Sequence, residues 1–295
     1  MNDLAVGGAT PKYLSVGFVL EEGLPLDTLR RLVGAMAAAA RRCGVEIVTG
    51  DTKVVEKGNG DGVFINTTGV GFLPEAANFS AANVVPGDRI VLNGSLGEHG
   101  ITILAQREGL ELGGDLRSDT APLHELCAAV MKAAPGLHAM RDLTRGGLSS
   151  ALNEIARSAR VGVEIEERAI PVCEEVRGAC ELFGMDPLYV ANEGKMIAFV
   201  PEEEAEAALA AMQANELGRD ARLIGVVTQR HPRMVTLRTT LGTERIVDML
   251  AQDQLPRIVS KGNCSCMNWR WRSRYWMQSA GSWKRIRARL RCESA

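Results

Sequence analysis

The stretch MRDLTRGGLSSALNEIARSARVGVEI, residues 140–165, joins a helical pattern to a strand pattern. Leu148, Leu152 and Ile155 recur at helical spacing, which predicts a helix over 146–160 with one buried face. The apolar and β-branched residues of 161–165 predict a strand directly after it. Because helices and strands alternate in this way along most of the chain, we expect an α/β (α+β) fold.

The same patterns extend in both directions from this stretch. Before it we expect strands over 13–20, 45–55, 63–73 and 89–92, and helices over 26–42, 99–107 and 122–134. After it we expect strands over 196–200, 221–227 and 234–238, and helices over 173–182 and 202–212.

Changes in composition predict two domains and a tail. The segment 75–86 is rich in small and polar residues and leads into the turn Pro86-Gly87, so we expect it to link two domains. We place the first domain at 1–82 and a second, α/β domain at 86–250. The segment 259–295 differs from both and is expected to be a disordered basic tail.

Charge and tryptophan are concentrated in this tail. The net charge of the 295 residues is −2, yet 260–295 contains nine Lys or Arg and one acid, Glu293. All four Trp lie there, at 269, 271, 276 and 283. The acidic remainder offers no field that attracts nucleic acid, so only the tail, in which Arg alternates with aromatics, could bind it.

Cysteine usage and hydropathy indicate a cytoplasmic protein. The seven cysteines are an odd number and show no CxxC spacing, which favours a reducing compartment over a disulfide framework. No apolar run approaches the length of about 18 residues that a membrane span needs. No HExxH motif, GxxxxGK[ST] motif or GxGxxG loop after a strand is present.

Two stretches suggest a nucleotide site. In TGDTKVV, 49–55, Asp51 and Lys53 project from one face of a strand, where they could hold Mg²⁺ and a phosphate. An ion pair at the end of the strand is the alternative. In MRDLTRGG, 140–147, Gly146 and Gly147 open a helix whose free amides could bind an anion beside Asp142. The alternative is that Asp142 or Thr144 only caps that helix.

Two further stretches contain carboxylates beside glycines. In NEGKM, 192–196, Glu193 lies on the turn before a buried strand, a suitable place for a general base. A plain turn with a solvated Lys195 is the alternative. Near the start of the chain, Asp3 precedes the pair Gly7-Gly8.

Together these stretches resemble the family of the hydrogenase maturation factor HypE, within the aminoimidazole ribonucleotide synthetase superfamily. The resemblance covers about residues 1–258. It rests on six motifs in the order of that family: NDLAVGGATPKYLS (2–15), EEGLP (21–25), VTGDTKVVEKG (48–58), FINTTGVG (64–71), MRDLTRGG (140–147) and NEGKM (192–196).

The resemblance implies a two-domain fold similar to aminoimidazole ribonucleotide synthetase, a homodimer formed through the sheet of the first domain, and ATP as a substrate. It implies that the carbamoyltransferase HypF loads a carbamoyl group onto a C-terminal cysteine. The group is then dehydrated to a thiocyanate, which a HypC–HypD complex carries to the iron of a [NiFe] hydrogenase.

The resemblance also implies roles for individual residues. Asp3 and Asp51 would bind the Mg²⁺ of the nucleotide, Lys53 its phosphates, and Glu193 would remove the amide protons. Asp142, Gly146 and Gly147 would belong to the same site.

Two departures from the family pattern lead us to expect an impaired chain. The opening segment of the family, with its glycine-rich nucleotide loop, is absent, and Val259 follows Ile258 where the family ends on cysteine. We expect the tail to be a frameshift or read-through product. The alternatives are another ATP-dependent small-molecule phosphotransferase of the superfamily, or an interaction protein that binds through the tail.

Overall fold

The structure is a computed structural model that describes residues 1–74, 78–110 and 114–249, and these residues form two separate β-sheets. The predicted tail therefore lies outside the described residues. Within the described part of the chain, no helix combines the length and the apolar character that crossing a membrane would need.

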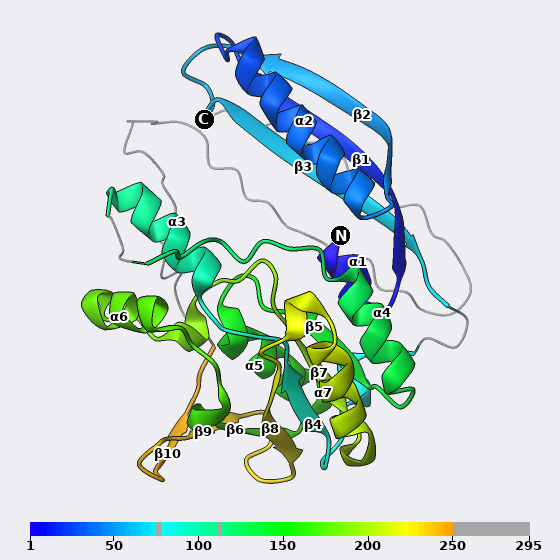
Figure 1. Cartoon of the computed structure of the whole chain (residues 1–295), viewed down its shortest axis with the longest axis vertical. Coiled ribbons are helices and arrows are strands. Elements are labelled where there is room, and N and C mark those ends of the chain that lie inside the picture. The colour runs from blue at the N-terminus through cyan, green and yellow to red at the C-terminus, as the bar shows by residue number, and fades with distance from the viewer. Residues whose placement is uncertain (75–77, 111–113, 250–295) are drawn as a thin grey trace, which may run out of the picture. The chain divides into compact units, whose positions relative to one another are not determined.

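The first sheet contains the strands predicted near the start of the chain. Strands β1 (Thr10–Glu21), β2 (Glu46–Val55) and β3 (Val63–Phe72) are arranged in the order β2-β1-β3. Strand β2 runs parallel to β1, so the chain must cross over between them, and helix α2 (Leu26–Arg42) makes this connection and packs against β2 (Figure 1). The predicted helix over 26–42 is confirmed with its boundaries.

Much of the first sheet is exposed although its residues are apolar. In β2, only Val55 is even partly covered. Eight large apolar side chains of the sheet are exposed: Val19, Ile47, Val48, Val54, Phe64, Ile65, Val70 and Phe72. A surface of this kind on a sheet is typical of a protein–protein interface.

The second sheet has seven strands in the order β10-β9-β6-β8-β4-β7-β5. Its strands are β4 (Arg89–Leu92), β5 (Ala139–Asp142), β6 (Gly162–Glu166), β7 (Met196–Val200), β8 (Arg222–Thr228), β9 (Val235–Arg238) and β10 (Glu244–Ile246). Neighbouring strands are antiparallel except for β6 and β9.

Helices pack on the second sheet through distinct apolar clusters. Helix α5 (Gly147–Ala159) packs its predicted apolar face, including Leu148, Leu152 and Ile155, against β4, β6, β7 and β9. Helices α4 (His124–Ala133) and α7 (Ala205–Gln213) share a second cluster with Val91, Met196 and Ala198. Helices α3 (Glu98–Glu108) and α6 (Glu174–Phe183) form a third cluster.

Helix α1 (Asn2–Val6) precedes the first sheet in the chain, but its buried residues belong to the second core. Ala5 and Val6 pack in the same cluster as α4 and α7. Gly8 has φ +82, and a Cβ at this position would lie 2.2 Å from the ring of Phe79. The boundaries at 82 and 86 stay a prediction, although the two sheets lie on either side of them.

Two strands were missed because they are short and lie at the edges of the sheet. Among the described residues, β5 pairs with β7 alone and β10 with β9 alone. Strand β4 is equally short but has the apolar run Ile90–Leu92, whereas β5 (AMRD) and β10 (ERI) contain charged residues and no such run. Pairing with a neighbour therefore decides the conformation of β5 and β10. The omission of β5 matters for the site, since Asp142 is its last residue.

Candidate functional site

Three predicted carboxylates, Asp3, Asp142 and Glu193, come within electrostatic reach of one another. Asp142 ends β5 and pairs with Met196 at the start of β7, and Glu193 lies on the turn just before β7. Asp3 lies on α1, which contacts β5. Residues that are 190 positions apart in the chain thus contribute to one site.

The environment of Glu193 raises the pKa of its carboxyl above the usual range of a glutamate. Burial raises the pKa of the Glu193 carboxyl, while His99 acts in the opposite direction. The carboxylates of Asp119, Asp142 and Asp3 raise this pKa further. A carboxyl whose pKa moves up toward neutrality is better suited to exchange protons with a substrate.

Asp142 is almost completely buried, with a side chain that is 4% exposed. Burial raises its pKa, the neighbouring Arg141 guanidinium lowers it, and Asp3 raises it. Arg141 donates a hydrogen bond from Nη1 to Oδ1 of Asp142 at 2.9 Å, and pairs with Glu154 through its Nη2. Arg141 therefore partly neutralises Asp142, and in the described part of the chain no side chain donates a hydrogen bond to its Oδ2.

Helix α5 begins at Gly147 without a side-chain cap, so neither Asp142 nor Thr144 has the capping role considered above. Gly146 has φ 75 and Gly147 has φ 58, a region that side chains rarely adopt. A Cβ on Gly147 would lie 2.6 Å from the Val190 carbonyl oxygen. The glycines thus let α5 start directly against the segment that leads to Glu193.

The turn that carries Glu193 is held by buried asparagines. Asn192 donates to the carbonyls of Leu143 and Val190 and accepts from the Gly97 amide at 2.8 Å. Asn93 accepts from the Met196 amide at 2.7 Å and donates to the Gly194 carbonyl. These bonds fix the backbone on both sides of Glu193.

Lys195 is not solvated, so the alternative of a plain turn is wrong. Its side chain is 13% exposed, and its Nζ lies 2.9 Å from Glu98 and 3.4 Å from Asp119. It also lines a cavity of about 470 Å³, together with Gly194 and Cys173. Lys195 therefore neutralises two carboxylates beside the Glu193 turn.

Asp51 and Lys53 lie on one face of β2, as predicted. Lys53 on β2 lies opposite Val19 on β1, and Val19 lies opposite Phe64 on β3, so the three residues form a row across the sheet. Asp51 accepts a hydrogen bond from the Thr52 amide, and among the described residues no ion pair joins Asp51 to Lys53. The predicted ion-pair alternative is therefore absent, and both charges face outward from an edge strand.

The structure links Asp3, Asp142 and Glu193, but within its described residues no hydrogen bond or ion pair connects Asp51 or Lys53 to them. Nor does the described part of the chain contain three or more His, Cys, Asp or Glu side chains placed to hold a metal ion. Carboxylate oxygens suit Mg²⁺, which usually keeps several waters and phosphate oxygens as its other ligands. The donors present therefore fit a nucleotide-bound Mg²⁺ but form no complete cage.

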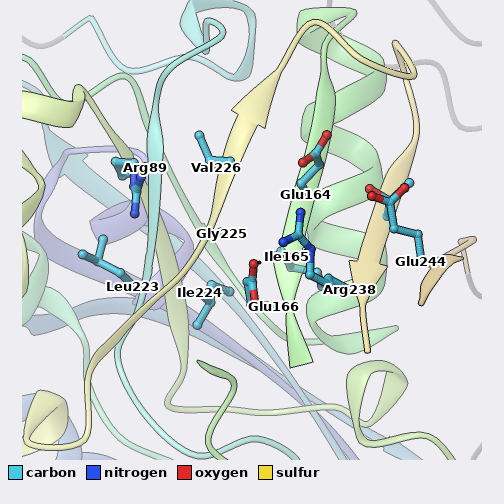
Figure 2. Close-up of a pocket in the computed structure, with 11 residues that line it drawn as sticks. Arg89, Glu164, Ile165, Glu166, Leu223, Ile224, Gly225, Val226, Arg238 and Glu244 are labelled. Atoms are coloured by element: carbon cyan, nitrogen blue, oxygen red, sulfur yellow. Dashed lines mark ion pairs between the residues drawn. The ribbon is translucent and has the colours of Figure 1, made fainter. Parts of the chain in front are cut away.

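A second cavity, of about 230 Å³, lies on strands β4, β6, β8 and β9 (Figure 2). Its charged lining includes Arg238 and Glu166, which form an ion pair at 3.8 Å, and Arg89. None of the predicted site residues lines it. The carboxylate cluster, and not this cavity, is therefore the candidate active site.

The sequence patterns missed Asp119 and Glu98, which contact Lys195. Asp119 belongs to the loop between α3 and α4, more than 70 residues before the Glu193 turn, and no motif marks it. Only its burial and its partners in the folded chain identify it.

Two family models match this chain. The N-terminal domain of AIR synthase related proteins matches residues 1–73, and the C-terminal domain of the same proteins matches residues 85–236. Carbamoyl dehydratase HypE of Azotobacter vinelandii is 56% identical over 258 residues, which cover 88% of this chain and 76% of the relative. The Escherichia coli K12 protein of the same name is 47% identical over 257 residues, 87% of this chain and 76% of the relative.

Solved structures agree with these relatives. A structure of the hydrogenase maturation protein HypE in complex with ATP superposes with a TM-score of 0.83 at 46% identity, over 86% of this chain and 77% of that one. A HypE–HypF complex gives a TM-score of 0.82 at 44% identity, over 84% and 81%. A thiamine-monophosphate kinase from Stenotrophomonas maltophilia, 21% identical with a TM-score of 0.63, shares the fold.

Proposed function

This chain belongs to the family of the carbamoyl dehydratase HypE, and from this we propose that it uses ATP to dehydrate a carbamoyl group carried on a cysteine sulfur. The predicted two-domain fold of the aminoimidazole ribonucleotide synthetase type is confirmed by the family models and the HypE structures. The observation that carries the proposal is the half-buried Glu193 carboxyl, whose charged neighbours include Asp142 and Asp3.

The chemistry needs phosphate transfer followed by loss of protons. The amide oxygen of the S-carbamoyl group attacks the γ-phosphorus of ATP, and ADP leaves. The C–O bond then breaks as phosphate departs, and the two N–H protons are removed to leave a C≡N triple bond. Glu193 accepts protons in this second stage, because its carboxyl lies at the mouth of β7 with a raised pKa.

Charge neutralisation is the other requirement of phosphate transfer. We assign the binding of phosphates to Lys53, and oxygen ligands for Mg²⁺ to Asp3 and Asp51, with Asp142, Gly146 and Gly147 completing the nucleotide site. Mg²⁺, when bound, would offset the charge that develops on the phosphate oxygens. Because Lys53 and Asp51 face outward from an edge strand, we propose that a second subunit completes this site.

The proposed partners follow from the relatives. The solved HypE–HypF complex supports HypF as the source of the carbamoyl group, and the family supports a HypC–HypD complex as the acceptor of cyanide. The proposed setting is the cytoplasm, where these maturation proteins would meet.

Synthetic S-carbamoyl-cysteine tests the proposal. Because this substrate supplies its own sulfur, the test does not need the cysteine that Val259 replaces. We expect the full chain with ATP and Mg²⁺ to release phosphate and to form S-cyanocysteine at the reduced rate of an impaired chain, detected by mass spectrometry as the loss of one water. Nucleotide binding without S-cyanocysteine would favour the alternative of another phosphotransferase of the superfamily.

Lys53→Ala is expected to weaken ATP binding by about tenfold to a hundredfold, the typical effect of one lost charge-assisted hydrogen bond. Isothermal titration calorimetry with ATP and Mg²⁺ measures this change. Lys57→Ala, which removes a lysine from the turn after β2, is the matched control and should bind like the wild type. Equal affinities for all three proteins would remove Lys53 from the site.

A homodimer formed through the first sheet is a second part of the proposal. Phe64 lies near the start of β3 and is 50% exposed in the chain. Phe64→Glu would place a charge in the proposed interface, so we expect sedimentation velocity to show a monomer where the wild type is a dimer. Leu241→Glu alters a side chain that is 90% exposed on the turn between β9 and β10, outside the first sheet, and should leave the dimer intact. A monomeric wild type would contradict this part of the proposal.

The chain carries Val259 where the family resemblance places the reactive cysteine. Valine has no nucleophile, so we expect no cyanation of Cys264, Cys266 or Cys292 when the chain is incubated with HypF, carbamoyl phosphate and ATP. Mass spectrometry of tryptic peptides decides this, since a cyanated cysteine in any of the three positions would show that the tail serves as substrate.

A further inference from the structure

Asp119 holds the backbone of the Glu193 turn through a buried carboxylate. Its side chain is 1% exposed. Oδ1 accepts a hydrogen bond from the Glu193 amide at 3.0 Å, and Oδ2 accepts one from the Gly194 amide at 3.2 Å. The Nζ of Lys195, 3.4 Å from Oδ2, compensates the charge. A carboxylate that binds two successive amides fixes both position and orientation of a turn.

The two backbones also touch directly. A Cβ on Gly194 would lie 1.9 Å from the carbonyl oxygen of Asp119. Only glycine leaves room for this approach, so the sequence Glu193-Gly194 and the loop around Asp119 are matched to each other.

Asn2, which lies 191 positions before Glu193 in the chain, also holds this turn. Its Nδ2 donates to the Ala121 carbonyl at 2.9 Å and to the Glu193 carbonyl at 3.2 Å. Its Oδ1 accepts from the Leu123 amide at 3.0 Å. Because Asn2 is the neighbour of Asp3, these bonds also tie α1 to the turn.

The Glu193 carboxyl itself is left available. Among the described residues, hydrogen bonds hold the Glu193 backbone at its amide and its carbonyl, and none holds its carboxyl. A general base needs this combination, because the backbone must be rigid while the carboxyl must be free to meet the substrate.

We propose that Asp119 and Asn2 are positioning residues for Glu193, which hold its backbone amide and carbonyl so that the carboxyl meets the reacting amide of the substrate. This inference rests on the proposed function. Displacing a reacting group by about 1 Å can cost about a hundredfold in rate, so loss of either residue should slow the reaction, and loss of Asp119 should do so without changing the affinity for ATP.

The test compares three variants of the full chain. Asp119→Asn keeps the shape of the side chain but offers one acceptor oxygen to two amides, and Asn2→Ala removes the second hold. Asp115→Asn is the control, since Asp115 lies on the same loop, is exposed, and in the part of the chain that the structure describes pairs with Arg117 alone.

Hydrogen exchange of the Glu193 and Gly194 amides, followed by mass spectrometry, is measured together with kcat and KM for ATP on S-carbamoyl-cysteine. For Asp119→Asn we expect exchange at these amides to be about tenfold faster or more. We expect kcat to fall about tenfold to a hundredfold while KM for ATP stays unchanged. Asn2→Ala should show the same faster exchange and lower kcat, together with a higher KM for ATP because Asn2 also anchors the helix that carries Asp3. Asp115→Asn should match the wild type.

Two results would overturn the inference. One is unchanged exchange at Glu193 and Gly194 in both Asp119→Asn and Asn2→Ala. The other is faster exchange with an unchanged kcat, which would make the contacts structural only. A wild type that shows no turnover would count against the proposed function alone, because the exchange rates would still decide whether Asp119 and Asn2 hold the turn.

Discussion

Glu193→Gln is expected to lower kcat for the dehydration of S-carbamoyl-cysteine by about a hundredfold to ten-thousandfold, the usual contribution of a general base. Glutamine has the same shape but cannot accept a proton, while the backbone contacts of the turn do not depend on the side chain. The affinity for ATP should therefore persist. Coupled measurement of phosphate release and S-cyanocysteine, with calorimetry for ATP, separates the two effects.

Glu203→Gln is the matched control, since Glu203 is exposed on the 3₁₀ turn after β7 and should be replaceable without effect. If Glu193→Gln kept its rate, another group would have to remove the amide protons.

The pH dependence of the reaction gives a second test of Glu193. Glu193 must be ionised to act as a base, and its pKa is raised by burial and, among its neighbours, by Asp142. As the pH is lowered, activity should therefore be lost at a higher pH than an ordinary glutamate would cause. Asp142→Asn removes one of the charges that raise this pKa, and should move the acid limb to lower pH.

Gly147→Ala is expected to lower the free energy of unfolding by about 2 to 4 kcal/mol. Alanine is disfavoured at φ +58, and its Cβ would meet the carbonyl oxygens of Val190 and Leu188 at 2.6 and 2.7 Å. These are backbone atoms that cannot turn aside, so α5 must move away from the segment leading to Glu193. Urea unfolding followed by circular dichroism measures the loss.

Gly184→Ala separates the two causes. Gly184 has φ +63 at the end of α6, and nothing lies within 4 Å of a Cβ built there. This control should therefore cost only the conformational penalty of about 1 kcal/mol. Equal losses for both variants would show that the approach of α5 to residues 188–190 has no energetic weight.

The sequence by itself predicted most elements of the fold and the family of the chain. Helix α2, strand β4 and strand β7 have the boundaries that their patterns predict. The helical pattern of α2 is long, and β4 and β7 are mostly buried apolar runs. The motifs around Asp51, Asp142 and Glu193 pointed to phosphate and proton chemistry. The relatives confirm the family, whereas the individual roles of these residues stay predictions.

Tertiary structure decided which of these residues meet. Strand β5 exists because it pairs with β7, and this pairing brings Asp142 to the turn of Glu193. Lys195 looked like a solvated lysine in the sequence, but the folded chain pairs it with Glu98 and Asp119.

Asp119 shows the physical reason for this limit. A pattern of apolar residues in the sequence reveals a helix or a strand, because residues close together in the chain form its buried face. A hydrogen bond across 74 positions leaves no such apolar pattern, and any loop aspartate has the same local pattern. The hold on Glu193 therefore becomes visible only when the loop between α3 and α4 packs against the start of β7.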